Sequence, residues 1–525
     1  MIDLHRRRLL AASGNIILLA GLGRAHDVWA QPRLEGYPYT LGVAAGDPQP
    51  DGFVIWTRLC PKPLEEAGGM PPRAAIVRWE VAEDERFSNL ARAGEAIARP
   101  ELAHAVHVEV DGLKPGRRYW YRFTMAGADA SPTGTARTAP PADADSARLR
   151  LGVAGCQNYE SGYFDAFGHL SREDDLDAVF HYGDYIYEAT ARRPVGTADE
   201  HGRIRARAHL GQELYSLDQY RRQYALYKSD SDLQAAHAAA AFIVSFDDHE
   251  VDNNWAADKD QDGTPAEIFA LRRTAALQAW YEHMPVRRAQ FPRNGQLQLY
   301  RRLDYGRLMR LHLLDTRSYR DDQLCSPRDK GPCRTQDRQD GTLLGTQQEA
   351  WLARGMEGGR RWNLIAQQVM MMPMARTGPD GRRTSSTDTW NGYPAARRRL
   401  IEAIEARGLT NVVIASGDAH HHYAGVVPAR DEEPDGRAAA TEFLATSISS
   451  EGDGTADMTL SAQLLRDNPN LKLHNQQRGY QLFDVTPAEW RTTLKVMDKV
   501  TTPGGQISTL KSFVVEPHQA LMHEV

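Results

Sequence analysis

The sequence predicts an α/β protein in which a small all-β unit precedes a larger, layered domain of strands and helices. Short apolar and aromatic runs separated by turn residues fill residues 37–138, which indicates strands. From residue 148 onward the pattern changes to strand, loop and helix. The chain has 525 residues, more than one ordinary hydrophobic core requires. Its length suggests roughly two to four domains.

The first unit, residues 37–138, is predicted to be a β-sandwich of the immunoglobulin or fibronectin kind. Runs such as Val54-Ile55-Trp56 and Tyr119-Trp120-Tyr121 are β-branched or aromatic, as strands prefer. Short strands at regular spacing with turns between them are typical of a sandwich. The strand candidates are Tyr39–Val43, Phe53–Leu59, Ala75–Val81, Ala105–Val110 and Arg118–Met125. Residues 139–147 are rich in Pro and Ala and are predicted to be a linker.

Residues 148–525 are predicted to form the second domain, which ends in a closing C-terminal segment. Helical periodicity predicts helices at Gly162–Arg172, Phe269–His283 and Ala395–Arg407. The alternation of elements predicts helices layered on a mixed central sheet. Apolar runs predict strands at Leu149–Ala154, Ala178–His181, Phe242–Phe246, Leu308–Leu314, Leu364–Met372, Val412–Ala415 and Phe443–Ser447.

Residues 1–30 have the features of a targeting segment. Arg6-Arg7-Arg8 precedes a mildly apolar run, and Ala30 offers a small residue for cleavage. Consecutive arginines with modest hydrophobicity are typical of a twin-arginine signal, a route that exports folded proteins. No later stretch has the roughly 18 consecutive apolar residues that a membrane helix needs. We therefore expect a protein without a transmembrane segment that the twin-arginine export machinery carries to the periplasm or the outside.

Charge and cysteine content exclude some classes of protein. The net charge is −6 with basic and acidic residues mixed throughout, so the sequence carries no nucleic-acid-binding signature. Four cysteines are too few for a disulfide scaffold. Cys325 and Cys333 lie close in one loop, and they are either a local disulfide or two free thiols.

Residues with metal-ligand chemistry follow the predicted strands where these end. Because parallel strands present their carboxyl ends at one edge, we expect these residues to converge on one edge of one sheet. Each of them alone has a structural explanation: a buried Cys is often a small hydrophobic residue, and an Asp often caps a turn. Their coincidence favours a site. The segments are Gly155-Cys156-Gln157, Gly183-Asp184-Tyr185-Ile186-Tyr187-Glu188, Asp247 to Trp255, Asp315-Thr316-Arg317 and Ser416 to His422.

These residue types together predict a polynuclear metal site. Carboxylates so close would repel one another and stay partly protonated unless cations neutralise them. Cations that share Asp184 would also clamp a phosphoryl group and acidify a bound water. A carboxylate beside the phenol of Tyr187 suits a hard cation such as Fe³⁺. Arg317 offers a planar fork for phosphate oxygens, and His249 a proton donor to the phosphoryl group or the leaving alkoxide.

Three motifs at these strand ends resemble one family. GDYIYE at 183–188, DDHEVDNNW at 247–255 and the Gly417-Asp418-x-His420 ending resemble the PhoD-like alkaline phosphatases, a family that includes phospholipase D enzymes. These belong to the wider calcineurin-like metallophosphoesterases. The segments 41–59 and 478–486 resemble the opening and closing parts of the same family, so the likeness covers essentially the mature chain. It implies an αββα sandwich for the second domain.

The resemblance also implies roles by matching position. It makes His249 the phosphate-contacting residue, and it implies one Fe³⁺ with one or two Ca²⁺. Asp418 stands where most of the superfamily has a His, and this harder ligand suits Ca²⁺. A further His of the superfamily falls near Ala366-Gln367-Gln368, where this chain has none. The implied metal ligands are Cys156, Asp184 as the bridge, Tyr187, Asp248, Asp418 and His420, with Asn253, Asn254 and Asp247 as additional candidates.

These observations predict an exported phosphatase. We expect hydrolysis of phosphomonoesters, with phosphodiesters as a second substrate class, through in-line attack by a metal-bound hydroxide or oxide. One alternative is a phosphodiesterase acting on phospholipids or teichoic-acid-like polymers, because fold similarity does not decide the substrate. The other is a surface metal-binding or adhesion protein without catalysis, against which the presence of His249 beside the full ligand set argues.

Overall fold

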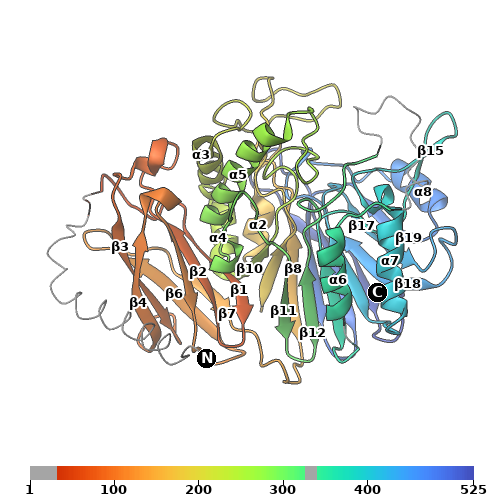
Figure 1. The fold of residues 1–525 in the computed structure, drawn as a ribbon, viewed down its shortest axis with the longest axis horizontal. Helices are drawn as coiled ribbons and strands as arrows, with labels where there is room; N and C mark the ends of the chain where they lie inside the picture. The colour runs from red at the N-terminus through yellow and green to blue at the C-terminus, as the bar shows by residue number, and fades with distance from the viewer. Residues whose placement is uncertain (1–31, 33, 325–339, 357) are drawn as a thin grey trace, which may run out of the picture.

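The computed structural model describes residues 32, 34–324, 340–356 and 358–525. The predicted signal segment 1–30 and the Cys325–Cys333 pair lie outside these residues. Two large sheets pack face to face and helices cover their outer faces, which confirms the predicted layered α/β architecture (Figure 1). Among the described helices, none is both long enough and apolar enough to span a bilayer.

The larger sheet has ten strands and runs through both predicted units. Strands β8, β9, β10 and β1 are mutually parallel, and the remaining strands extend the sheet antiparallel on both sides. Its order is β23 (Met522–Glu524), β22 (Ile507–Val515), β21 (Trp490–Met497), β20 (Gly479–Val485), β8 (Leu149–Ala154), β9 (Ala178–His181), β10 (Ala241–Val244), β1 (Val43–Gln49), β2 (Gly52–Arg58) and β5 (Ala105–Val110).

The N-terminal region is a two-layer β structure that shares a sheet with the rest of the chain. A four-stranded sheet of β4 (Leu90–Ala98), β3 (Ala75–Ala82), β6 (Arg118–Thr124) and β7 (Gly134–Arg137) packs on the β1-β2-β5 end of the large sheet. Side chains such as Phe53, Ile55 and Tyr121 fill the space between the layers. The first strand begins at Val43, where the predicted strand Tyr39–Val43 ends, and it pairs in parallel with β10 through Ala45 and Gly46.

The second large sheet has seven strands. Its order is β11 (Arg301–Tyr305), β12 (Met309–Leu313), β13 (Trp362–Ala366), β16 (Val412–Ser416), β18 (Ala438–Leu444), β17 (His422–Pro428) and β19 (Leu471–Asn475). A separate hairpin pairs β14 (Arg376–Thr377) with β15 (Arg383–Thr384). Strand β13 shows the alternation that layers produce, since Leu364 packs between the sheets and Ile365 packs towards the helices.

Helices lie on both outer faces. On the ten-stranded sheet are α2 (Asp165–Leu170), α3 (Leu217–Lys228), α4 (Ser231–Ala239) and α5 (Ala266–His283), and on the other are α6 (Gly345–Gly355), α7 (Pro394–Glu405) and α8 (Thr459–Asp467) (Figure 1). Helix α3 begins with a capping box. The Ser216 side chain accepts a hydrogen bond from the Gln219 backbone N–H, and the Gln219 side chain accepts one from the Ser216 backbone N–H. The short 3₁₀ segments are η2 (Glu66–Gly69), η3 (Pro100–Leu102), η4 (Arg288–Gln290) and η6 (Trp390–Gly392).

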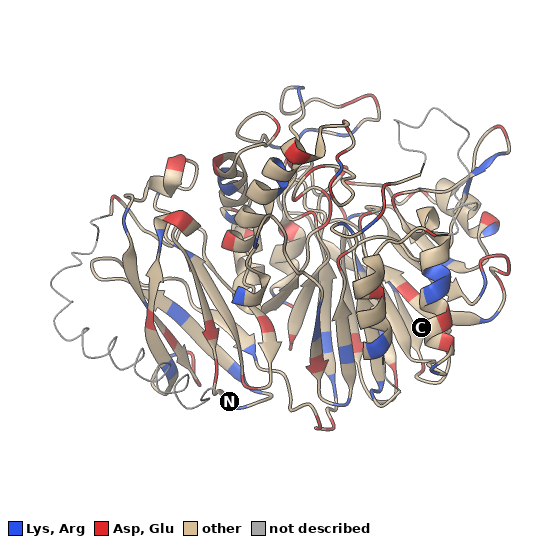
Figure 2. Ribbon diagram, in the orientation of Figure 1, with Lys and Arg blue, Asp and Glu red and all other residues tan. Residues whose placement is uncertain are grey.

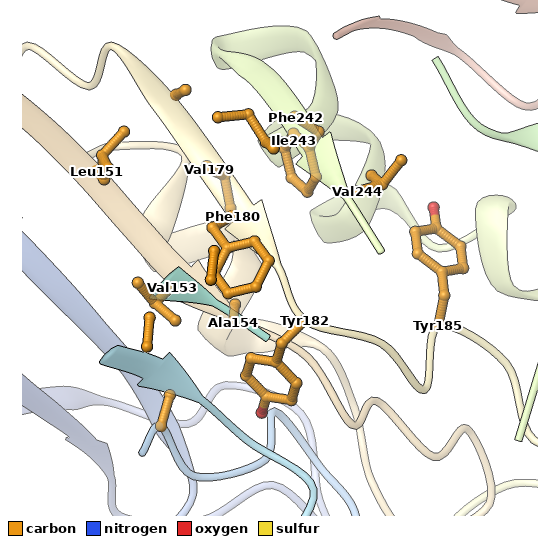
Figure 3. Packing of buried hydrophobic residues seen from close by; sticks show 14 of the residues in the cluster. Leu151, Val153, Ala154, Val179, Phe180, Tyr182, Tyr185, Phe242, Ile243 and Val244 are labelled. Carbon is orange, nitrogen blue, oxygen red and sulfur yellow. The ribbon is translucent and has the colours of Figure 1, made fainter. Parts of the chain in front are cut away.

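The core beneath the candidate site is apolar and closely packed. Val153, Phe180 and Ile243 are register partners on three adjacent strands, and they are buried side by side on one face of the ten-stranded sheet (Figure 3). Tyr182 and Tyr185 follow the end of β9 and stand between this core and the loops above it (Figure 3). The parallel strands therefore form a rigid base from which the loops at their carboxyl ends emerge.

The side chain of Lys228 is buried where β2 meets the second domain, and its burial leads to a prediction about stability. The ammonium of Lys228 lies 4.3 Å from the ring centre of Trp56 and 5.2 Å from that of Tyr185. Burial lowers the pKa of Lys228 from 10.5 to about 7. The unfolded chain therefore holds more protons between these two values, so this residue makes stability rise with pH across that window and costs stability below it.

We expect Lys228→Met to stabilise the protein by about 1–3 kcal/mol near pH 6 and to flatten that slope. Denaturant unfolding at several pH values between 6 and 10 measures both effects. Lys114→Met is the matched control, because Lys114 is exposed and paired with Glu83. Equal pH slopes in wild type and Lys228→Met would contradict the assignment.

Candidate metal centre

The predicted site residues come from the carboxyl ends of strands in both sheets. Cys156 follows β8, Asp184 and Tyr187 follow β9, and Asp247, Asp248 and His249 follow β10; Arg317 follows β12, and Asp418 and His420 follow β16. The expectation of one edge of one sheet was wrong, because β12 and β16 belong to the seven-stranded sheet. Face-to-face packing places the corresponding edges of both sheets beside each other, and the aromatic ring of Tyr182 lies against both Gly155 and Gly417 at this junction.

Several of these residues have an unusual backbone conformation that sets the direction of their side chains. Cys156, Asp184, Asp418 and His420 have φ values of 50°, 53°, 67° and 57°, in the left-handed region that non-glycine residues seldom adopt. Such residues cluster at functional sites, where the surrounding structure imposes the conformation. Here each one turns the chain sharply after a strand, so that its side chain points across the strand ends.

The first group of candidate ligands surrounds the phenol of Tyr187. Its oxygen donates to Asp184 Oδ2 at 2.8 Å and lies 3.2 Å from His420 Nε2. Cys156 Sγ lies 3.3 Å from the same carboxylate oxygen. One ligand atom each from Cys156, Asp184 and His420 lies within 4.8 Å of the others. A thiol, a phenol, a carboxylate and an imidazole thus surround one point.

Two further groups extend this arrangement. One ligand atom from each member of the set Asp184, Asp248 and His249 also falls within 4.8 Å, and so does one from each of Asp247, Asp248 and Asp418. Asp184 therefore belongs to the first and second groups, and Asp248 to the second and third. The donors become richer in oxygen along this series, from thiol and phenol to carboxylates alone.

The raised pKa values of these carboxyl groups indicate that the neighbouring residues supply too little positive charge to keep them all ionised. Burial, together with Asp248 and Asp247, raises the pKa of Asp184 well above its usual range against the opposing influence of His249. Burial and Asp247 raise the pKa of Asp418 likewise, and burial raises that of Asp247 to about 7 despite Arg317. Only cations can hold three such groups ionised at neutral pH.

Buried carboxylate oxygens without hydrogen-bond partners also indicate that the site needs cations. Asp184 Oδ1 and Asp247 Oδ2 are buried, and neither has a hydrogen-bond partner among the described residues. A buried carboxylate oxygen without a partner costs free energy unless it binds a proton or a cation. The residues present therefore fit bound metal ions.

His249 is held by a carboxylate that the sequence-based site did not include. Its Nδ1 lies 2.7 Å from Glu188 Oε2, and Glu188 Oε1 accepts from the Asn253 backbone at 2.9 Å. Although burial opposes it, the carboxylates of Glu188, Asp248 and Asp184 raise the pKa of His249 well above its usual value. The neighbouring carboxylates thus favour the protonated form of this imidazole. Glu188 ends the GDYIYE motif, and that position is the signal that could have identified it.

Glu250 organises the backbone of the same loops. Its buried carboxylate accepts hydrogen bonds from the backbone of Tyr185 at 2.6 Å, Asp247 at 2.8 Å and Asp184 at 3.1 Å. One side chain thereby joins the loop after β9 to the loop after β10. A sequence motif shows that a Glu is present at this position but not that it binds backbone, which is why its role was missed.

Arg317 lies inside the acidic cluster and is fully buried. Its Nε donates to Asp247 Oδ1 at 2.5 Å, and its two Nη atoms donate to Asp388 at 2.7 and 2.8 Å. Asp388, which precedes η6, also accepts from Arg320 Nη1 at 3.1 Å. These donors are engaged with protein carboxylates, so a phosphate-binding role for Arg317 stays a prediction. The geometry favours charge neutralisation instead, and nothing in the sequence linked the distant Asp388 to this cluster.

The two candidate asparagines behave differently from ligands in this structure. Asn253 Nδ2 donates to Gln261 Oε1 at 2.7 Å, away from the cluster. Asn254 donates its backbone N–H to Asp248 Oδ2 at 2.8 Å, which orients that carboxylate. Their roles as metal ligands stay predictions.

In the stretch Ala366-Gln367-Gln368, near which a further histidine of the superfamily was expected, Gln368 has a structural role. Strand β13 ends at Ala366, earlier than the predicted strand Leu364–Met372. Gln368 Oε1 then accepts from the Thr316 backbone at 3.1 Å and hydroxyl at 2.6 Å, and its amide donates to Ser245. This side chain fastens the end of β13 to the loops after β12 and β10.

Acidic residues recur in the loops above the strand ends, on the face where the three ligand groups lie (Figure 2). Known protein families match both parts of the chain. The family described as PhoD-like phosphatase matches residues 151–494, and that described as PhoD-like phosphatase, N-terminal domain, matches residues 24–140.

Relatives of known name match almost the whole chain. Alkaline phosphatase D of Bacillus subtilis (strain 168) is 41% identical over 527 residues, which cover 99% of this chain and 89% of that protein. A solved structure described as "Structure of PhoD" superposes with a TM-score of 0.89 at 42% identity, covering 94% of this chain and 93% of the other. The chain therefore belongs to the PhoD-like phosphatase family.

Proposed function

We propose that this protein is a metal-dependent phosphatase that hydrolyses phosphomonoesters, with phosphodiesters as a second substrate class. The observation that carries the proposal is the series of three ligand groups joined through Asp184 and Asp248, with His249 held beside them by Glu188. The similarity to alkaline phosphatase D supports the same reaction class.

We assign the ferric ion to Cys156, Asp184, Tyr187 and His420, and one or two calcium ions to the carboxylates that include Asp248 and Asp418. When bound, these ions would supply the positive charge that neutralises a phosphoryl group and activates water. The protein supplies the geometry: Asp184 belongs to two of the ligand groups that would hold the ions, and Glu250 fixes the loops that carry Asp184 and Asp247.

His249 supplies a proton. Glu188 engages Nδ1, which leaves Nε2 as the nitrogen that can donate to the phosphoryl group or to the leaving oxygen. The Tyr187 ring lies against the imidazole with ring centroids 4.1 Å apart, which restricts its rotation. Nδ1 and Nε2 therefore have separate tasks, one for orientation and one for proton transfer.

We also propose that the chain is exported through the twin-arginine route to the periplasm or the outside, and that residues 139–147 link the two structural units. The Arg6-Arg7-Arg8 segment supports this proposal, because consecutive arginines are typical of a twin-arginine signal. That route exports proteins that have already folded.

The experiment is metal analysis of the folded, exported protein, paired with hydrolysis of a chromogenic phosphomonoester and its bis-ester. We expect iron and calcium in the protein and turnover of the monoester. Turnover of the bis-ester alone would replace the proposal with a phosphodiesterase. Absence of both metal and turnover would leave a non-catalytic surface protein as the better explanation.

A further inference from the structure

A buried serine connects the two unusual candidate ligands of the first group. Ser450 follows β18 in the segment 448–452, which packs against the loop after β8: Ile448 donates its backbone N–H to Gly155 O at 3.0 Å. Ser450 is 2% exposed. Neither a motif nor the ligand assignments above include it.

The hydroxyl of Ser450 has three polar neighbours at hydrogen-bond distance. Its Oγ lies 2.7 Å from the phenol oxygen of Tyr187 and 2.7 Å from the carbonyl oxygen of Cys156. It also accepts from the Asn158 backbone N–H at 3.2 Å. One side chain thus touches the ligand atom of Tyr187 and the main chain of Cys156.

Counting protons shows what this hydroxyl can do. A serine hydroxyl has one proton to donate, and both the carbonyl of Cys156 and the phenol oxygen of Tyr187 can accept it. The phenol of Tyr187 donates its own proton to Asp184 at 2.8 Å, so its oxygen is free to accept from Ser450. When Tyr187 ligates a cation, its oxygen carries more negative charge and becomes the stronger acceptor of the two.

We propose that Ser450 is a positioning residue of the metal centre, whose hydroxyl donates to the ligating oxygen of Tyr187, fixes that oxygen between Asp184 and His420, and reduces the electron density it gives to the bound ferric ion. The inference rests on the proposed function, since it takes Tyr187 as an iron ligand. Hydrogen bonds to ligand atoms commonly set the affinity and electronic properties of metal sites.

The experiment compares the visible absorption of purified holoenzymes. A tyrosine oxygen bound to Fe³⁺ gives a charge-transfer band, and loss of a hydrogen bond to that oxygen raises its donor level. We expect the band of Ser450→Ala to move to longer wavelength, with iron affinity about 10–100-fold weaker. Ser449→Ala is the matched control, because Ser449 is buried on the same loop and its hydroxyl donates to Asn158 O at 2.9 Å, away from Tyr187.

Each outcome decides the proposal. A shifted band in Ser450→Ala with an unchanged band in Ser449→Ala supports it. An unmoved band in Ser450→Ala at full iron content overturns it and leaves the phosphatase proposal intact, whereas wild type without iron or band overturns the iron assignment and this inference together. If Ser450→Ala loses iron, Ser450→Thr decides: a wild-type band with iron bound supports the role of the hydroxyl, and loss of iron there too overturns it.

Discussion

Replacing Asp184 by Asn is expected to lower phosphatase activity by about 10³-fold or more and to deplete both metals together. Asp184 belongs to two of the three ligand groups, so its removal affects both metal positions at once. In the metal-free protein, by contrast, the same substitution should increase the stability of the fold. Its Asp184 has a raised pKa, so ionisation costs stability as pH rises above about 4, and Asn avoids that cost.

Metal analysis, turnover and thermal unfolding of metal-stripped samples test these three effects. The matched control is Asp177→Asn, because Asp177 lies beside the opposite end of β9 and accepts from the Arg150 backbone at 2.8 Å. We expect that control to retain both metals and activity. A folded Asp184→Asn protein with full metal content and full activity would refute the proposed centre.

Replacing His249 by Gln is expected to reduce kcat by about 10²–10⁴-fold while both metals stay bound. In the proposed mechanism the imidazole contributes a proton at Nε2, because its Nδ1 is engaged with Glu188. The loss should be larger for alkyl phosphates than for nitrophenyl phosphate, because a poor leaving group needs the proton more. Steady-state kinetics with a series of leaving groups measures this dependence.

His107→Gln is the control for that series, since His107 lies on β5 and binds the carbonyls of Tyr281 and Met284 far from the strand ends. A loss in His249→Gln that is equal for all leaving groups would argue against proton donation and for a role in binding the phosphoryl group.

The sequence predicted the parts of the fold that depend on local pattern. Strands β8 and β9 were predicted to the residue, because mainly apolar runs followed closely by Gly mark buried parallel strands. Strand β4 was missed because its residues are mostly small, polar and exposed. The shared sheet was missed for another reason: the pairing of β1 with β10 joins residues some 200 positions apart, and no local pattern records such a contact.

The candidate site shows the same division. Residues at strand ends could be predicted together, since strand direction alone brings Cys156, Asp184 and Asp248 to one side. Asp388 and Ser450 come from loops whose paths the sequence does not define, so their contacts with Arg317 and Tyr187 needed the structure. Arg317 was predicted to bind phosphate because of its residue type. In the structure its side chain binds Asp388, and the sequence does not show that Asp388 lies beside it.

The order of strands in the ten-stranded sheet also constrains how the chain can fold during synthesis. Strand β1 is made first but finds its parallel partner only when β10 has emerged, and β8 pairs with β20, whose residues 479–485 come near the end of the chain. Sheets with such distant pairings fold slowly, because long loops must close before contacts form. The ligand-bearing loops should therefore acquire their final shape only after nearly the whole polypeptide has left the ribosome, so that a truncated product would carry the motifs without the assembled ligand groups.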